Sequence, residues 1–90
     1  MKETVYKALS NACRREIIHL LRWRNLSAGE IASHFHISKP SISRHLDVLK
    51  NAELITDKRN GASIEYSLNM TVIQELRMQL IELLGGADES

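Results

Sequence analysis

The strongest structural signal in this chain lies in residues 38–46, Ser38-Lys39-Pro40-Ser41-Ile42-Ser43-Arg44-His45-Leu46. The segment begins with a serine that can cap a helix and a proline suited to the first helical turn, where a missing N–H group costs nothing. Ile42 and Leu46, continued by Leu49, recur at helical spacing and predict a buried stripe. The opposite face carries hydroxyls and cations, with no acidic residue before Asp47. Such a face suits an anionic partner, although a merely solvated helix start is the alternative.

Three further helices are expected before this one. Ser27-Ala28-Gly29-Glu30 matches the capping box, in which the serine and glutamate side chains satisfy each other's free backbone donors. The helix that it starts should end near His34-Phe35, before a tight turn at His36-Ile37. A short helix over residues 2–10 and a second one, capped by Asn11 and ending near Arg24-Asn25, complete the N-terminal half.

The apolar pattern changes after this half. Residues 54–59 and 63–68 flank Asn60-Gly61, which predicts a β-hairpin because both turn positions tolerate positive φ. From about Asn69 helical spacing returns and continues to Gly85-Gly86, followed by a tail that we expect to be loose. The predicted order is therefore four helices, two strands and a last helix, in a single domain over residues 1–90.

Two short helices joined by a tight turn and followed by a β-hairpin are typical of a winged helix-turn-helix. We therefore predict a mainly α-helical domain with a small β-hairpin wing, whose fourth helix enters the major groove of double-stranded DNA. Ser41, Ser43, Arg44 and His45 should point outward together, with Arg44 suited to a guanine edge. The full set of predicted DNA-binding residues is Ser38, Lys39, Ser41, Ser43, Arg44, His45, Lys58 and Arg59.

The last predicted helix has more apolar residues than one face of a helix can hold. A chain of 90 residues can bury only a modest core. We therefore expect the first and last helices to pair with their copies in a homodimer, although the alternative is that the wide stripe belongs to the core. The predicted interface residues are Val5, Leu9, Val72, Ile73, Leu76, Leu80 and Leu83.

Composition and charge narrow the class of protein. Residues 1–26 carry six Lys and Arg against two acids, whereas residues 69–90 carry one against four. A net charge of +1 therefore conceals a basic end that can face an anionic partner. No apolar run approaches the roughly 18 residues of a membrane span, and the N-terminus has no signal-peptide core. We expect a cytoplasmic protein, associated with the nucleoid when bound to DNA.

Enzymatic and metal sites find no support in the sequence. There is no nucleophile–base pair at workable spacing, no phosphate loop and no pair of acids on one helical face, so we do not expect an enzyme. His34 and His36 lie two residues apart across a helix end and are expected to be polar turn residues rather than metal ligands. We predict no cofactor and no metal site.

Five other residues allow more than one interpretation. Cys13 is expected to be a packing residue rather than a reactive thiol, and as a single cysteine it forms no disulfide within the chain. Trp23 and Phe35 are expected to anchor the core or its rim rather than stack on bases. Arg14 and Arg15 could contact phosphate or pair with nearby glutamates.

From Ala8 to Leu68 the chain resembles the ArsR-type winged-helix repressors of bacteria. The matching segments are residues 14–21, 26–32, 37–50 and the hairpin residues Lys58-Arg59-Asn60-Gly61. The chain is most similar to the SdpR-like autorepressors, which share the phrase ISKPSIS followed by HL. The resemblance implies a homodimeric repressor that binds an imperfect palindrome near a promoter, often its own. An unidentified inducer or anti-repressor protein is left open as a further partner.

The chain departs from the sensing elements of that family. Metal-sensing members use a Cys-x-Cys element in the third helix, or His and acid clusters on the last helix. Here residues 27–35 contain no cysteine, and residues 69–84 contain neither cysteine nor histidine. Thiol-sensing members pair cysteines on the second and last helices, and Cys13 has no such partner. The alternative function is a winged-helix protein–protein interaction module, whose exposed helix would carry leucine, methionine or aromatic anchors.

Overall fold

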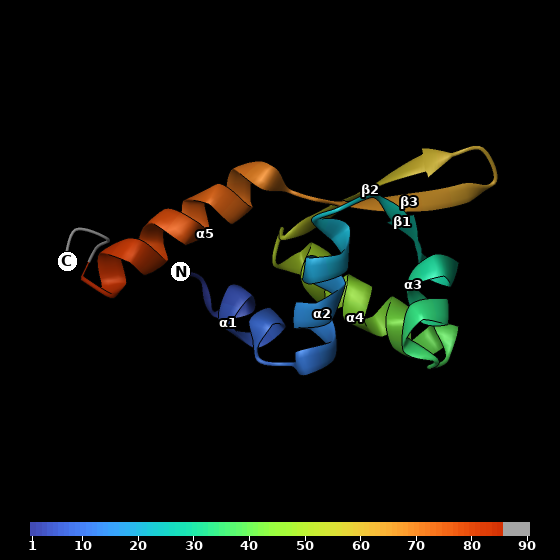
Figure 1. Ribbon diagram of the computed structural model, residues 1–90, viewed down its shortest axis with the longest axis horizontal. Helices are drawn as coiled ribbons and strands as arrows, with labels where there is room; N and C mark the ends of the chain where they lie inside the picture. Colours follow the sequence, from blue (N-terminus) through green and yellow to red (C-terminus); the bar gives the residue numbers. More distant parts are fainter. Residues whose placement is uncertain (86–90) are drawn as a thin grey trace.

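The computed structural model describes residues 1–85, and these residues form five helices and a three-stranded sheet. The elements in chain order are α1 (Glu3–Leu9), α2 (Ala12–Leu21), β1 (Leu26–Ser27), α3 (Ala28–Phe35), α4 (Lys39–Asn51), β2 (Ile55–Asn60), β3 (Ser63–Leu68) and α5 (Met70–Leu83). Helices α1 to α4 form a body, the β-hairpin extends along one side of it, and α5 leaves the body in the opposite direction (Figure 1). The tail predicted after Gly85 lies outside the described residues.

Capping residues determine where α3 and α4 begin and where α3 ends. Ser27 Oγ accepts a hydrogen bond from the Glu30 N–H, and the Glu30 carboxylate accepts one from the Ser27 N–H at 2.8 Å, which confirms the capping box. Helix α3 ends because His36 adopts a left-handed conformation, with φ of 58°. Ser38 then caps α4, with Pro40 in its first turn. The helix pair is therefore set by its local sequence.

Helix α2 ends three to four residues earlier than its pattern suggested. It stops at Leu21, and Leu26 and Ser27 form a short strand opposite Tyr66 and Glu65 of β3. Leaving the helix lets Leu26 enter the core, where it is 6% exposed. A strand of two residues has no periodicity of its own, so the sequence did not indicate β1.

The sheet order is β1-β3-β2, and all its pairs are antiparallel. Asn60 pairs with Ser63, so the two residues of the hairpin turn are Gly61 and Ala62 rather than the predicted Asn60 and Gly61. Gly61 has a φ of 65°, which a glycine adopts at little cost. The dipeptide thus located the hairpin correctly but missed its register by one residue.

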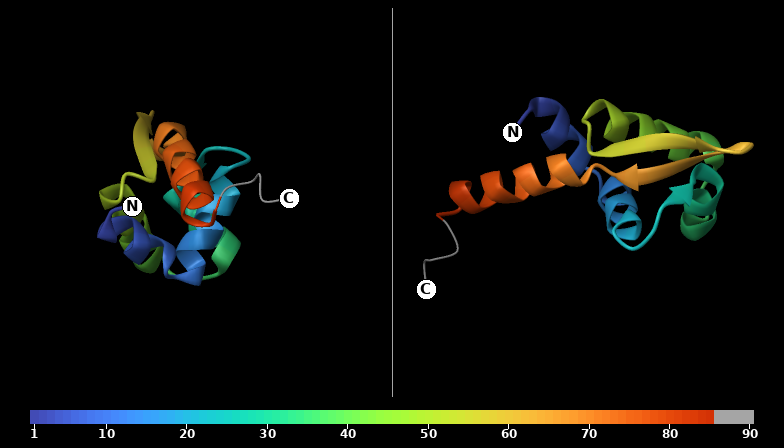
Figure 2. Two further views of the ribbon diagram at one scale, coloured as in Figure 1. Left: turned by 90° about the vertical axis from the view of Figure 1, so that its left-hand side faces the viewer. Right: turned by 90° about the horizontal axis from the view of Figure 1, so that it is seen from above.

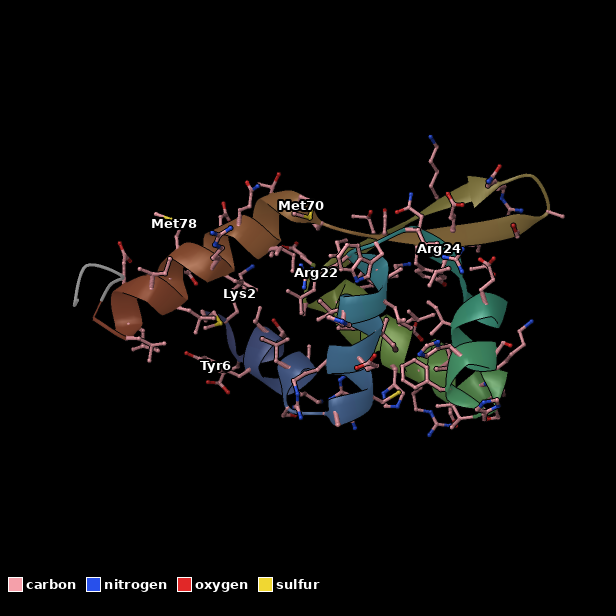
Figure 3. All side chains as sticks on the ribbon, viewed as in Figure 1. Lys2, Tyr6, Arg22, Arg24, Met70 and Met78 are labelled. Atoms are coloured by element: carbon pink, nitrogen blue, oxygen red, sulfur yellow. The ribbon has the colours of Figure 1, made fainter. Side chains whose placement is uncertain are left out.

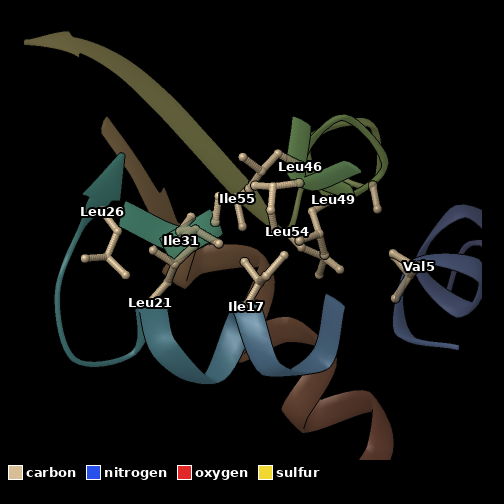
Figure 4. Close-up of a cluster of buried hydrophobic side chains, with 13 residues drawn as sticks. Val5, Ile17, Leu21, Leu26, Ile31, Leu46, Leu49, Leu54 and Ile55 are labelled. Atoms are coloured by element: carbon tan, nitrogen blue, oxygen red, sulfur yellow. The ribbon is translucent and has the colours of Figure 1, made fainter. Parts of the chain in front are cut away.

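The core lies between the four body helices and the base of the hairpin (Figure 4). The predicted stripe of Ile42, Leu46 and Leu49 is confirmed, since each of these side chains is at most 1% exposed. Phe35 packs against the core as expected. The expectation for Trp23 was wrong, because its side chain is 73% exposed and lies beside the Arg22 guanidinium, 5.2 Å from the ring centre.

Helix α5 extends from the body as an arm, which is seen most clearly in the right-hand view of Figure 2. Its residues Val72, Ile73 and Leu76 pack against the core, but none of its side chains is buried. Met78, labelled in Figure 3, projects from α5 away from α1 and the body. Within residues 1–85, no helix combines the length and the apolar character needed to cross a membrane.

Candidate DNA-binding surface

The N-cap Ser38 and the two serines within α4, Ser41 and Ser43, have different surroundings. Ser38 Oγ accepts the Ser41 N–H at 3.3 Å and donates to Ser41 Oγ at 3.0 Å. Both hydroxyls therefore take part in starting the helix. Ser43 is exposed, and among the described residues its hydroxyl has no hydrogen-bond partner. Ser43 is consequently the serine of α4 whose hydroxyl is most available to a ligand.

The outer face of α4 carries the cations that the sequence predicted there. Lys39 and Arg44 are exposed, on the side of the helix away from the buried Ile42 and Leu46. Lys39 also borders a hollow of about 350 Å³, which the beginning of α3 and the hairpin line from the other sides. The start of α4 and the wing therefore form one continuous surface.

His45 does not point outward with Ser43 and Arg44, contrary to the prediction. Its ring is half-buried on the flank of α4, and its Nδ1 lies 3.2 Å from Nη1 of Arg14 on α2. Burial lowers the pKa of His45, and the positive charges of Arg14 and Arg44 lower it further. The imidazole is therefore neutral at pH 7.

Arg14 and Arg15 bind the carbonyl end of α1. Arg14 donates from Nε to the Ala8 carbonyl at 2.9 Å and from Nη2 to the Lys7 carbonyl at 2.8 Å. Arg15 donates from Nη1 to the Leu9 carbonyl at 2.8 Å. The sequence offered phosphate or glutamate as partners and missed this role, because backbone carbonyls at a helix end have no signature in the side chains.

The wing carries Lys58 and Arg59 near its tip, and both side chains are exposed. They lie opposite Glu65 and Ile64 on β3. Closer to the body, Lys50 at the end of α4 donates to Asp57 of β2 at 2.7 Å. This ion pair joins the base of the wing to the end of α4.

A second surface lies along α5. An apolar groove of about 420 Å³ separates this helix from the body, and Leu9, Ile18 and Leu54 line its body side. Leu80 is 41% exposed at the groove, and Leu83 at the end of the helix is 68% exposed. The α5 side of the groove is lined by Ile73, Leu76, Arg77, Leu80, Ile81 and Leu84.

One residue of the predicted dimer interface is buried in the single chain, and the others lie at different surface features. Val5 is 4% exposed and belongs to the core of the single chain, because α1 packs this residue inward. Val72 lines a separate hollow near Met1 and Glu53. The predicted interface residues that line the apolar groove are Leu9, Ile73, Leu76 and Leu80.

Other candidate residues lie in ordinary surroundings. Burial raises the pKa of Cys13, and the opposing effect of Arg14 is smaller, so the reactive thiolate is disfavoured. The His34 ring meets Phe35 edge-on, with 5.3 Å between ring centres. Across residues 1–85, no three His, Cys, Asp or Glu side chains gather in a way that could hold a metal ion.

Comparison with known proteins identifies the family. Residues 12–57 match the model described as "Bacterial regulatory protein, arsR family". The chain is 49% identical over 84 residues to the transcriptional repressor SdpR of Bacillus subtilis, covering 93% of each chain. It is 33% identical over 86 residues to the arsenical resistance operon repressor of Staphylococcus xylosus, covering 96% of this chain and 82% of that protein.

Solved structures agree with this assignment. An ArsR-like transcriptional regulator from Rhodococcus sp. RHA1 matches with a TM-score of 0.82 at 26% identity, over 91% of this chain and 75% of that chain. This likeness confirms the predicted winged helix-turn-helix fold, mainly helical with a small antiparallel sheet. The chain therefore belongs to the ArsR family of bacterial regulatory proteins and is a DNA-binding transcriptional regulator rather than an enzyme.

Proposed function

We propose that this chain is a homodimeric transcriptional repressor that binds a palindromic operator, with its own promoter as the first operator to test. The observation that carries the proposal is the outer face of α4, where Ser43 and Arg44 are exposed above a fully buried stripe. A helix anchored in this way can enter a major groove without losing its position on the body. The repressors among the relatives support the direction of the regulation.

The residues of this surface divide into readers and anchors. Arg44 can make a bidentate contact with guanine, and Ser43 can bond to a neighbouring base edge or to phosphate. Ser38 and Ser41 hold the start of α4, whose free N–H groups favour a phosphate. Lys39 and the wing residues Lys58 and Arg59 supply cations for the DNA backbone.

The proposed dimer forms through α5 and α1. Helix α5 has no buried side chain, although its apolar residues cover more than one face. A second copy of the chain offers a surface of the same shape and chemistry, which fits a two-fold interface at the apolar groove. Two copies of α4 would then meet two half-sites separated by about one helical turn of DNA.

The outer face of α4 also bears on the alternative, a module that binds other proteins. Such a module would expose leucine, methionine or aromatic anchors on this helix. The exposed residues on the described α4 are polar, charged or proline, which favours DNA as the partner. The proposed place of action is therefore the nucleoid in the bacterial cytoplasm.

The effector that would release the DNA is not a metal ion in this proposal. Stoichiometric zinc or cadmium should leave operator affinity unchanged, because the described residues offer no cluster of ligands. Release at one metal ion per protomer would contradict this. An organic inducer or an anti-repressor protein then remains as the partner to seek.

The decisive experiment is a binding titration with DNA from upstream of the chain's own gene and with a scrambled duplex of equal length. We expect the upstream DNA to bind at least about 10³-fold more tightly than the scrambled duplex, with a steep dependence on salt. Footprinting should show two half-sites about 10 base pairs apart. Equal affinity for both duplexes would contradict specific recognition, and specific binding only at other promoters would contradict autoregulation.

A further inference from the structure

Arg14 is held by contacts from two helices. Its Nε and Nη2 donate to the Ala8 and Lys7 carbonyls of α1, and its Nη1 meets Nδ1 of His45 on α4. All three nitrogens of the guanidinium group are therefore engaged, and its plane is fixed. Arg14 and His45 are 31 residues apart in the chain, so this contact exists only in the folded protein.

The chemistry of the two groups determines which of them donates. A guanidinium group has five N–H donors, no acceptor, and remains charged throughout the physiological pH range. His45 Nδ1 must therefore accept the hydrogen bond, which places the proton of the neutral ring on Nε2. Among residues 1–85, no side chain or backbone group bonds to Nε2. Every buried side-chain nitrogen or oxygen atom of the half-buried and buried residues in this range has a hydrogen-bond partner, so Nε2, which has none, must contact solvent. The Nε2–H group is therefore accessible.

We propose that Arg14 is a positioning residue that holds His45 in its Nε2–H tautomer, so that His45 offers DNA a hydrogen-bond donor and never an acceptor. The partner is then a DNA acceptor, either a phosphate oxygen or the N7 or O6 atom of a purine. This inference rests on the proposed function, because it assigns a chemical role to one residue of the same helix. It also explains why a ring on the flank of α4, beside Arg44, faces a cation instead of an acid.

The surrounding charges oppose protonation of the ring. Arg14 acts on it from α2 and Arg44 from its own helix, and no carboxylate bonds to it among the described residues. Protonation would place a second N–H on Nδ1, directly facing the Arg14 donor, and would break the contact. The neutral ring, with its Arg14 contact, should therefore persist to a lower pH than it would for an ordinary histidine.

The first experiment examines His45 in the free protein by ¹⁵N NMR of its ring. We expect the wild-type ring to be neutral at pH 7, with the hydrogen on Nε2. In Arg14→Gln the tautomers should mix and the pKa of His45 should rise. Arg15→Gln is the matched control, because it removes a bond to the same end of α1 without touching His45, and it should leave the ring unchanged.

Two results of this experiment would overturn the proposal. One is a wild-type ring that is protonated at pH 7 or carries its hydrogen on Nδ1. This measurement uses only the wild-type protein and so does not depend on whether a variant folds. The other is an identical shift in Arg14→Gln and Arg15→Gln, which would show that Arg14 acts only by capping α1. Neither result depends on DNA, so failure here differs from failure of operator binding.

The second experiment tests the donor on DNA. Glutamine can place an amide N–H near the position of Nε2, whereas the shorter asparagine matches Nδ1. His45→Gln should therefore bind the operator within about fivefold of the wild type, and His45→Asn should lose more than that. A loss confined to the operator assigns a base as the acceptor, and an equal loss on the scrambled duplex assigns a phosphate. If Asn retains more affinity than Gln, the donor assignment is wrong.

Discussion

Helices α4 and α5 are both amphipathic, but the single chain fully buries the apolar stripe of only one of them. The stripe of α4 is buried within the body, and a serine caps the helix. Helix α5 is also capped, by Asn69, yet none of its side chains is buried and Leu83 is 68% exposed. Local signals therefore form both helices, whereas burial distinguishes α4, whose apolar stripe is covered, from α5, whose apolar residues remain partly exposed.

Charge divides the molecule in the same way. The exposed side of α4 and the wing carry Lys39, Arg44, Lys58 and Arg59, whereas the last 22 residues carry one cation and four acids. The exposed cations of α4 and the wing attract DNA, and the acids of the C-terminal residues repel it. This asymmetry favours an orientation in which the wing and α4 face the duplex and α5 points away from it.

The largest expected effect comes from charging the apolar side of α5. Leu80→Glu together with Leu83→Glu should give monomers that retain the fold, because both side chains are exposed in the single chain. Operator affinity should fall by about 10²- to 10⁴-fold, since the two half-sites are no longer bound by one linked unit. Sedimentation and a binding titration measure both effects. Gln74→Glu with Gln79→Glu adds the same charge outside the groove, and a dimer unaffected by the leucine changes would place the interface elsewhere.

A truncation in each helix tests the contrast in burial directly. Leu46→Ala should lower the free energy of unfolding by about 2–5 kcal/mol, because it leaves a cavity under α4. Leu83→Ala should change the stability of the monomeric Leu80→Glu background by less than about 0.5 kcal/mol. Urea denaturation provides both values. Equal losses at the two sites would show that α5 is packed as completely as α4.

A substitution on the outer face of α4 should affect recognition and leave folding unchanged. Arg44→Ala is expected to cost about 1–3 kcal/mol on the operator and to relax the preference at one base pair in each half-site. Ser43→Ala should cost less, because water can replace one hydroxyl bond. Titrations against operators varied one base pair at a time measure these effects. Uniform weakening on every duplex would make Arg44 an anchor to phosphate.

The smallest expected effect belongs to the wing. Neutralising Lys58 and Arg59 to glutamine should weaken binding to operator and scrambled DNA alike, and reduce the salt slope by about one unit per lost phosphate contact. Affinities at several salt concentrations give the slope. Lys2→Gln is a control that removes a cation near α1 and its 3.9 Å contact with Glu53. A loss seen only on the operator would mean that the wing reads bases.

Signals that act over three or four residues were reliable guides to this fold. The Ser27–Glu30 box, the Ser38 cap and the stripe beginning at Ile42 each join neighbours on one helical turn, and the structure has them as predicted. The β-hairpin and the excess of apolar residues on α5 were also evident from the spacing of apolar residues in the sequence. The exposed positions of Lys39, Ser43 and Arg44 follow from that stripe, because a helix that buries one face must present the other.

Errors arose where a residue's surroundings come from a distant part of the chain. Leu26 became a strand because β3 lies beside it, and Val5 became core because α1 turns it inward. Trp23 lies in the segment after α2, where its ring is 73% exposed, because the stripe that α2 buries consists of Ile17 and Leu21. Side-chain type gives only an average tendency for burial, and each of these outcomes depended on the particular neighbour.

The order of the elements, their caps and the cationic face of α4 are properties of the amino-acid sequence, because they follow from interactions between residues one helical turn apart. The state of His45 is a property of the tertiary structure. Its ring could donate or accept when considered alone, and it acquired one role when folding brought Arg14 to within 3.2 Å. Hydrogen-bond direction depends on the partner as well as on the residue, and packing supplied that partner from 31 residues away.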